Sequence, residues 1–422
     1  MLVENQFPRD TRVRNEASAL TSRGLRVSVI ALGGAGEPRR ETVNGVTVYR
    51  LPRLTVFKKL PRAERSGLVA IANKLRVLVG YVVEYLYFTV GCLLVSCYVA
   101  VKDGFDVVHA HNPPDTLFVV GALHKLFGKK FVFDHHDLSP ELYRSRYPTG
   151  SALISRGLAI CERASVKIAD ALIATNESYR AIDIERNGID ASKVFIVRNG
   201  PDLARVRLTE PDPWLQSKGR VLLGYVGAMN PQDGVDYMLR ALHHLRYQLN
   251  RSDFFCVAIG DGDSLEELKT LSVSLGLQDH LALTGFISDE DMVRLLSTVD
   301  ICLDPNPSSP LNDVSTWIKV MEYMALGKPV VSFDLKETRV SAAGAALYVK
   351  PNDEAEFAAA IAKLMDDPAE RARMAEVGRT RVQNDLGWQV TSKNLLSAYE
   401  FLLGPAATLR SSTAVGESRP RA

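Results

Sequence analysis

The strongest constraint on the fold is a regular alternation along the chain, in which short runs rich in β-branched residues are followed by longer segments of helical periodicity. This alternation is typical of parallel sheets that are covered by helices on both faces. The first half predicts strands at residues 27–32, 46–50, 106–109, 130–134, 171–174 and 194–197. The second half repeats the pattern at residues 220–226, 254–259, 281–284, 301–303, 329–332 and 346–349. The sequence therefore predicts an α/β protein with two similar sheets in tandem.

The two sheets should belong to separate domains. A chain of 422 residues with 46% hydrophobic content is long enough to bury two cores of ordinary domain size. Residues 199–219 contain three prolines and several charges and have no periodicity, so we place the boundary there. The expected domains are 1–205 and 206–386, followed by a helix at 387–404 and a disordered tail at 405–422.

Two segments of the first half are ambiguous. Only Met1–Val3 are apolar before Glu4, so we expect a very short first strand or a late start. Residues 77–101 are long and apolar enough to span a bilayer, but the chain continues at once with a strand of the same sheet, so we expect a buried or half-buried helix. The basic run before this helix leaves peripheral contact of residues 58–101 with an anionic membrane open.

Composition excludes several classes of function. The formal net charge is only +2, so no global field indicates nucleic acid as a partner. The five cysteines are odd in number and show no CxxC spacing, which favours reduced thiols in the cytoplasm. Polar residues 4–6 follow the first three residues, so no secretory signal is expected. We expect a cytoplasmic protein, with the inner face of the membrane as its place if it attaches.

Glycine-rich turns follow two strands of the second half. Gly227 follows strand 220–226, and Gly260 and Gly262 follow strand 254–259; a helix begins shortly after each turn. Free N–H groups and the positive end of a helix dipole suit a phosphate at such a junction. Two aspartates flank Gly262 and could hold a divalent metal instead, but no further ligand lies nearby in the sequence. We expect a phosphate site without a metal.

A cation and a carboxylate lie one helical turn apart in the segment 312–331. Ser315 is expected to cap a helix that presents Lys319 and Glu322 on one face. The lysine would neutralise a diphosphate, and the glutamate would accept hydrogen bonds from ribose hydroxyls. The alternative is an ordinary surface ion pair between the two side chains.

Histidines gather at two expected strand ends, at His109, His111, His135 and His136. Such histidines can contact a ligand in a crevice, and hydrogen-bonded structural histidines are the alternative. The spacing of His109 and His111 could also indicate a metal pair, but no other cluster of metal ligands supports it. We therefore predict neither a metal nor a cofactor.

These motifs together resemble a known family. The run from Lys319 and Glu322 through Gly327 and Pro329, with Ile259–Gly262 and Gly285–Phe286 upstream, resembles the donor half of family 4 (group 1) glycosyltransferases. Further segments resemble the family's first loop and helix, its two acceptor-side segments and its C-terminal helix; they are Asp10–Ala17, Asp106–His111, His136–Glu141 and Trp388–Leu403.

The resemblance implies two Rossmann-like domains facing across a cleft (the GT-B fold), with the C-terminal helix crossing back to the N-terminal domain. It also implies a UDP-, GDP- or ADP-linked sugar as donor, retention of anomeric configuration and no bound metal. The catalytic residues it implies are His136, Lys319 and Glu322. The donor-binding residues are Gly227, Gly260, Gly262, Gly285, Ser315, Lys319 and Glu322. The acceptor-side residues are Arg12, His111, Asp137 and Glu141.

The chain departs from the family pattern at two places. Val314 stands where many members have a first glutamate, and residues 228–234 contain none of the usual basic phosphate ligands. We expect transfer of a hexose-like sugar to a hydroxyl acceptor, lipid-linked or oligosaccharide. A nucleotide-sugar epimerase and a catalytically silent sugar-nucleotide-binding scaffold are the alternatives. A nicotinamide oxidoreductase ranks last, because Gly33–Gly36 lacks the spacing of a dinucleotide fingerprint.

Overall fold

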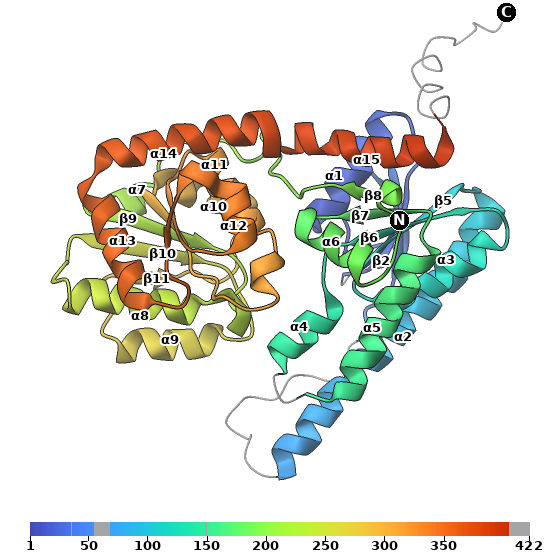
Figure 1. Ribbon diagram of the computed structural model, residues 1–422, viewed down its shortest axis with the longest axis horizontal. Coiled ribbons are helices and arrows are strands. Elements are labelled where there is room, and N and C mark those ends of the chain that lie inside the picture. Colours follow the sequence, from blue (N-terminus) through green and yellow to red (C-terminus); the bar gives the residue numbers. More distant parts are fainter. Residues whose placement is uncertain (35, 55–67, 148–149, 405–422) are drawn as a thin grey trace, which may run out of the picture. The chain divides into compact units, whose positions relative to one another are not determined.

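The computed structural model describes residues 1–34, 36–54, 68–147 and 150–404, and the chain forms two compact units (Figure 1). Unit 1 comprises Met1–Pro140, Gly150–Val197 and the chain from Ser392 onward, and unit 2 comprises Glu141–Thr149 and Arg198–Thr391. The division follows Val197 rather than residue 205, because Arg198 lies 3.7 Å from Glu337 of unit 2 and Arg205 pairs with Asp289 of the same unit. The expected tail at 405–422 lies outside the described residues.

Unit 1 contains an eight-stranded sheet in the order β3-β4-β2-β1-β5-β6-β7-β8. All neighbouring strands are parallel except β3 and β4. The strands are β1 (Leu2–Gln6), β2 (Ser28–Leu32), β3 (Arg40–Val43), β4 (Val46–Leu51), β5 (Val107–His111), β6 (Lys130–His135), β7 (Ala171–Ala174) and β8 (Val194–Ile196). The six strands predicted for this half are confirmed, whereas β3 was not predicted.

The expectation of a very short first strand was wrong. Strand β1 reaches Gln6 and pairs with β2 on one side and β5 on the other, so it lies inside the sheet. Its polar residues 4–6 disguised it in the sequence. Backbone pairing extends the strand through these residues, because every strand residue offers an N–H and a C=O whatever its side chain.

The helices of unit 1 cover this sheet. They are α1 (Thr11–Ser22), α2 (Leu68–Lys102), η2 (Asp115–Leu117), α3 (Phe118–Lys125), α4 (Ser139–Arg146), α5 (Ala152–Ile168), α6 (Glu177–Glu185) and η3 (Ala191–Lys193). Asp10 caps α1, since its Oδ1 accepts the N–H of Val13 at 3.1 Å. Most of α4 groups with unit 2.

Helix α2 contains the apolar segment that was expected to be a half-buried helix. Its side chains Phe88, Cys92 and Val99 are buried, and the helix contacts α3, β2 and β4. Among the described helices, the part of α2 at Val82–Lys102 is the one long and apolar enough to cross a membrane, a test that core helices also pass. Strands β1–β4 before α2 and β5–β8 after it belong to one sheet, so a crossing would divide that sheet. The expectation that α2 packs on the sheet is confirmed.

Unit 2 contains six parallel strands in the order β11-β10-β9-β12-β13-β14. The strands are β9 (Val221–Val226), β10 (Phe254–Ile259), β11 (Leu281–Leu283), β12 (Ile301–Asp304), β13 (Val330–Phe333) and β14 (Ala346–Val349). This is the strand order of a Rossmann fold. Its strands are added to one side of the first strand up to the third, and to the other side from the fourth onward, so the order reverses between the first and fourth strands. The reversal lies between β9 and β12 in unit 2, and the corresponding point in unit 1 lies between β1 and β5.

The helices of unit 2 pack on both faces of its sheet. They are α7 (Pro213–Gln216), η4 (Pro231–Asp233), α8 (Val235–Tyr247), α9 (Leu265–Ser274), α10 (Asp289–Thr298), η5 (Asn312–Val314), α11 (Ile318–Ala325), α12 (Lys336–Ala342), η6 (Ala343–Ala345), α13 (Glu354–Asp366), α14 (Pro368–Arg381) and the π-turn Val382–Leu386. Helix α15 (Trp388–Leu403) begins in unit 2 and joins unit 1 from Ser392 onward.

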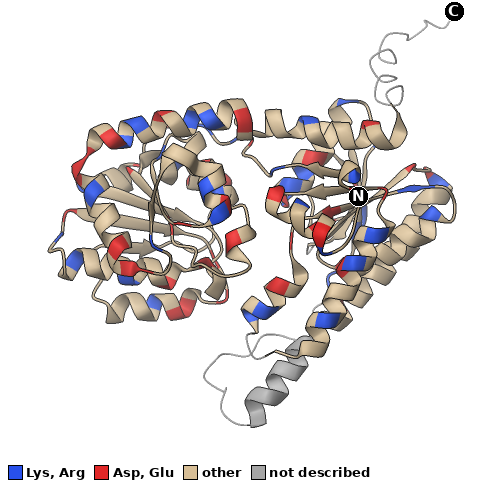
Figure 2. Cartoon of the chain, viewed as in Figure 1, with Lys and Arg blue, Asp and Glu red and all other residues tan. Residues whose placement is uncertain are grey.

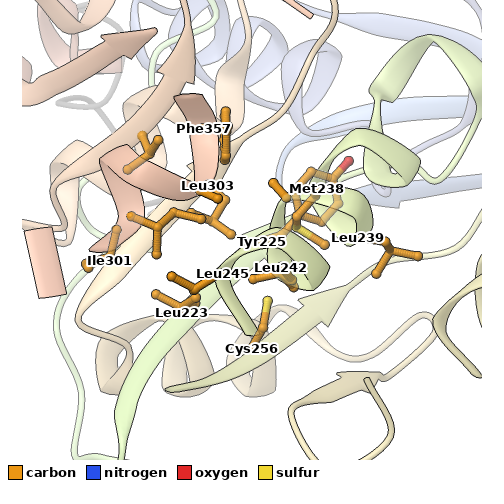
Figure 3. Packing of buried hydrophobic residues seen from close by; sticks show 14 of the residues in the cluster. Leu223, Tyr225, Met238, Leu239, Leu242, Leu245, Cys256, Ile301, Leu303 and Phe357 are labelled. Carbon is orange, nitrogen blue, oxygen red and sulfur yellow. The ribbon is translucent and has the colours of Figure 1, made fainter. Parts of the chain in front are cut away.

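One face of α8 anchors the turn that follows β9 in unit 2. Figure 3 shows Met238, Leu239, Leu242 and Leu245 of α8 among apolar side chains of β9, β10, β12 and α13. All four are fully buried, and each contributes roughly 1.5–3 kcal/mol by leaving water. This packing holds the start of α8 close to the end of β9, and thus positions the turn that joins them.

Candidate donor and acceptor sites

The carboxyl ends of β9, β10 and β11 bring the predicted glycines together in unit 2. The N–H of Gly227 donates to the carbonyl of Ile259 at 3.0 Å, and the N–H of Gly260 donates to the carbonyl of Gly285 at 3.1 Å. A Cβ on Gly260 would lie 1.9 Å from the Gly227 carbonyl oxygen, and one on Gly262 would lie 2.6 Å from that of Met229. The loops approach each other so closely that only glycine fits at these two positions.

Lys319 lies beside this glycine loop and is bound by two polar side chains. Its ammonium nitrogen is 3.2 Å from Oδ1 of Asp304 and donates to Oδ1 of Asn306. The same ammonium lies 4.8 Å from the centre of the Tyr225 ring, a cation–π contact. Lys319 is 7% exposed and does not pair with Glu322, so the alternative of a surface ion pair was wrong.

Glu322 has a different partner, the guanidinium of Arg205. One guanidinium nitrogen lies 3.5 Å from Oε1 of Glu322, and the other lies 2.5 Å from Oδ2 of Asp289. Burial raises the pKa of Glu322, and the positive charge of Arg205 partly offsets this effect. Arg205 and Glu322 are far apart in the sequence, so no local pattern indicated that they would form a pair.

The predicted helix cap at Ser315 was wrong. Helix α11 begins at Ile318, with Trp317 as its N-cap residue and no side-chain cap. The hydroxyl of Ser315 instead donates to the carbonyl of Leu311 at 2.7 Å. An N-terminus without a side-chain cap offers its N–H groups and its positive dipole to an anion.

In unit 1, the Asp134 carboxylate gathers three of the predicted residues. Its Oδ2 lies 2.7 Å from Nδ1 of His111 and 3.6 Å from Nε of Arg12, and its Oδ1 lies 3.5 Å from Nδ1 of His136. Burial opposes ionisation, but His136 and His111 outweigh it and hold the pKa of Asp134 well below its usual range. Asp134 was not singled out from the sequence, although it was the last residue of a predicted strand.

The loop after β6 is fixed mainly by Asn112. Its Oδ1 accepts the N–H groups of His136 at 3.0 Å and Asp137 at 3.2 Å, and its Nδ2 donates to the Asp137 carbonyl at 2.6 Å. Asp137 thus enters this arrangement through its backbone. Glu141 lies in the part of α4 that groups with unit 2, so it is described apart from the Asp134 cluster.

His135 points away from this cluster. Its Nδ1 lies 2.7 Å from Oδ1 of Asp183, and its Nε2 lies 3.6 Å from Oε2 of Glu162. Burial alone would lower the pKa of His135, but the two carboxylates raise it well above its usual value. Successive strand residues point to opposite faces, so two adjacent histidines belong to two different networks.

Two family models match the chain. Residues 10–200 match a glycosyl transferase 4-like domain, and residues 207–381 match the glycosyl transferases group 1 domain. The chain belongs to the group 1, family 4 glycosyltransferases. The first match contains Arg12, His111, Asp134 and His136, and the second contains the glycine loops, Lys319 and Glu322.

Named relatives of the family have diverse acceptors. The chain is 26% identical over 321 residues to a D-inositol 3-phosphate glycosyltransferase of Frankia alni. The alignment covers 72% of this chain and 76% of that protein. It is also 26% identical over 307 residues to a glycogen synthase of Mycobacterium tuberculosis, which covers 70% of this chain and 68% of that protein. These relatives support sugar transfer as the family's reaction and leave the acceptor open.

Solved structures share the fold. Sucrose-phosphate synthase of Thermosynechococcus elongatus aligns with a TM-score of 0.72 at 19% identity, covering 96% of this chain and 95% of that one. Anabaena HepE, solved with UDP and glucose, aligns with a TM-score of 0.67 at 15% identity, covering 94% and 98%. The expected fold class, with two Rossmann-like domains of the GT-B type, is confirmed.

Proposed function

We propose that this protein transfers a hexose-like sugar from a nucleoside diphosphate sugar to a hydroxyl acceptor, with retention of configuration and without a metal ion at the donor site. The observation that carries this proposal is the donor-side geometry of unit 2. Three glycine loops, the N-terminus of α11, Lys319 and Glu322 gather at the carboxyl ends of β9 to β12. The binding of UDP and glucose by HepE, which shares the fold, supports a sugar nucleotide as donor.

Each donor-side group suits one part of a sugar nucleotide. The backbone N–H groups at the start of α11 suit the diphosphate, whose charge increases as the glycosidic bond breaks, and the glycines let the loops lie close to it. An ammonium group has three N–H donors, so Lys319 keeps one for the diphosphate beyond those directed at Asp304 and Asn306. The Glu322 carboxylate would accept hydrogen bonds from the ribose hydroxyls. Lys319 thus supplies the charge that the missing basic residues after β9 supply elsewhere in the family.

The acceptor-side role belongs to the Asp134 cluster. The hydrogen bond of 2.7 Å to Asp134 orients the ring of His111, and Nδ1 of His136 lies 3.5 Å from the other oxygen of the same carboxylate. We assign His136 the hydrogen bond to the reacting sugar and Arg12 the contact with the acceptor. The acceptor class we propose is a lipid-linked sugar or a growing polysaccharide, because these present free hydroxyls to cytoplasmic enzymes.

Contact with a membrane surface is part of this proposal, and the outer face of α2 supports it. Apolar side chains recur along that face at one-turn intervals and are 38–91% exposed; they are Val82, Val83, Leu86, Val90, Leu94, Tyr98 and Val101. By contrast, α14 carries charged residues that pair along its surface (Figure 2). A helix that is apolar on both sides needs an apolar environment on both sides. We propose that this face meets lipid at the cytoplasmic surface; recovery of the protein entirely in the soluble fraction, in low salt and without detergent, would contradict this.

Two alternatives remain, and the missing basic residues after β9 motivate the second of them. A nucleotide-sugar epimerase would turn over its donor without any acceptor. A catalytically silent scaffold would bind a donor and neither transfer nor hydrolyse it. Incubation of the protein with the donor alone and then with acceptor distinguishes the three functions by their products.

The first experiment is thermal unfolding of the protein with UDP, GDP, ADP or NAD. A ligand at 100 times its Kd stabilises the native state by about 2.7 kcal/mol, so the matching nucleotide should raise the Tm by several degrees. Glu322→Gln should reduce this shift, while Glu376→Gln, a change on the exposed surface of α14, should keep it. A folded protein that responds to none of these nucleotides would overturn the proposal.

A further inference from the structure

A second group of polar residues lies under α1 in unit 1, next to the Asp134 cluster. It consists of Glu16 of α1, His109 and His111 of β5, and Asp134, whose ligand atoms all lie within 4.8 Å of one another. All four side chains are at most 1% exposed. No step of the proposed transfer uses Glu16 or His109, so their burial needs another explanation.

The two histidines direct the same ring atom toward Glu16. Residues two apart on a strand share a face, and the rings of His109 and His111 stack with centroids 4.3 Å apart. Nε2 of His109 lies 3.7 Å from Oε2 of Glu16, and Nε2 of His111 lies 3.9 Å from the same oxygen. These separations are too long for hydrogen bonds.

Each ring is oriented through its other nitrogen. Nδ1 of His111 lies 2.7 Å from the Asp134 carboxylate, so it carries the proton and leaves a lone pair on Nε2. Nδ1 of His109 lies 3.1 Å from the hydroxyl of Tyr399 in α15. A histidine ring held by a carboxylate or another oxygen at one nitrogen, with the second nitrogen free to coordinate, is the usual arrangement around a protein-bound metal.

The centre of the group consists of polar atoms without a hydrogen-bond partner. Within the described part of the chain, both carboxylate oxygens of Glu16 and both Nε2 atoms are buried and have no hydrogen-bond partner. A buried polar atom without a partner costs about 1–3 kcal/mol, so four of them at one point would be a large penalty. A single cation between them would satisfy three ligands at once.

We propose that Glu16, His109 and His111 bind a divalent transition-metal ion of the zinc type inside unit 1. Nitrogen and oxygen ligands of a tetrahedral zinc are about 3.4 Å apart, so a shift of a few tenths of an ångström would bring the observed atoms into place. Two imidazoles and one carboxylate favour Zn²⁺ over Mg²⁺, which prefers oxygen ligands. The ion would connect α1 to β5 and, through His109 and Tyr399, β5 to α15.

This inference does not rest on the donor chemistry, because none of its three ligands is a group proposed for the diphosphate, the ribose or the reacting sugar. Its competitor is a proton in place of the metal: burial and the neighbouring Asp134 raise the pKa of Glu16 well above its usual value. A protonated Glu16 would need no metal.

The test uses the full-length protein, freed of an affinity tag, dialysed against a chelator and then supplied with ZnCl2, CoCl2 or MgCl2. We expect one equivalent of zinc per chain by elemental analysis, a visible absorption band with cobalt, and a Tm raised by Zn²⁺ but not by Mg²⁺. Zinc content below a tenth of an equivalent after loading, with no change in Tm, would overturn the proposal in favour of the proton.

Three variants locate the ion among the eight histidines and five cysteines of the chain. Glu16→Gln should weaken zinc binding at least tenfold, and Tyr399→Phe, which removes only the hydroxyl beside His109, should weaken it about tenfold. His243→Gln in α8 is the matched control and should bind zinc like the parent protein. Zinc that binds equally well to Glu16→Gln lies elsewhere and overturns the assignment; should that variant fail to fold, Tyr399→Phe carries the same test.

Discussion

The two units place their polar residues at the same point of the same fold but build them from different parts of the chain. Unit 1 reverses its strand order between β1 and β5, and unit 2 reverses it between β9 and β12. Ligands of open α/β sheets bind outside the carboxyl ends of the strands at such points. In unit 1, buried side chains around Asp134 occupy this point. In unit 2, glycine turns follow the strands, and the side chains of Lys319 and Glu322 come from the later helix α11.

The difference follows from what occupies each strand end. His111 and Asp134 end or nearly end β5 and β6, so bulky titratable groups fill the space above the sheet. Gly227 and Gly260 follow β9 and β10, and their N–H groups donate to carbonyls of the neighbouring loops. The same location is thus built in two ways. Backbone hydrogen bonds between glycine loops hold it together in unit 2, and contacts between buried side chains hold it together in unit 1.

The largest effect on the free energy of unfolding should come from placing a side chain where the loops at Gly227 and Gly260 touch in unit 2. In Gly260→Ala the new Cβ would lie 1.9 Å from the Gly227 carbonyl oxygen at a φ of +140°, so the loops must separate. We expect a loss of about 3–5 kcal/mol in the free energy of unfolding, from backbone strain together with overpacking. Urea denaturation measures the loss, and nucleotide binding should disappear with it.

Gly285→Ala is the matched control for this change. Its φ is +72°, but a Cβ there would meet no atom within 4 Å. The cost should be only the left-handed strain of about 1–2 kcal/mol. Equal losses for the two alanines would show that close approach of the loops is not what selects glycine.

The next effect concerns the buried pair of Lys319 and Asp304. Asp304 is fully buried, so Lys319→Met leaves a carboxylate without its cation and should cost about 3–5 kcal/mol. Asp304→Asn together with Lys319→Met should cost less than the sum of the two single changes. Thermal unfolding of the four proteins in a double-mutant cycle measures this coupling, and strict additivity would contradict a direct pair.

The smallest effect should come from Glu4 in the central strand of unit 1. Burial raises the pKa of Glu4 to about 7, with a smaller contribution from Glu84. The native state then keeps a proton that the unfolded state loses above pH 4.5, so stability should fall as the pH rises from 4.5 to 7. Glu4→Gln removes the group and should flatten this part of the pH profile of the Tm.

The comparison of parent and Glu4→Gln at pH 4.5 and pH 7.5 decides the point. At pH 7.5 the glutamine variant should be the more stable of the two, because it no longer buries a charge. A parallel decline of both proteins over this range would assign the pH dependence to other groups.

Much of this protein could be predicted from its sequence. The strands predicted for both halves, the glycine turns after β9 and β10, and the positions of Lys319, Glu322, His111 and His136 at strand ends or on a helix face are local patterns. A period of two or 3.6 residues and the conformational freedom of glycine act over a few residues, so a linear sequence contains them.

The partners of these residues were decided by the tertiary structure. Arg205 beside Glu322, Asp304 beside Lys319 and Glu16 beside two histidines are contacts between elements far apart in the chain. The polar residues of β1 form a strand because they pair with β2 and β5. Ser315 does not cap α11, because its hydroxyl donates to the carbonyl of Leu311 instead. The sequence by itself determined the elements and the kind of residue at each strand end. Which side chains meet at the strand ends depends on burial and on the order of the strands, and both are fixed only when each sheet has formed.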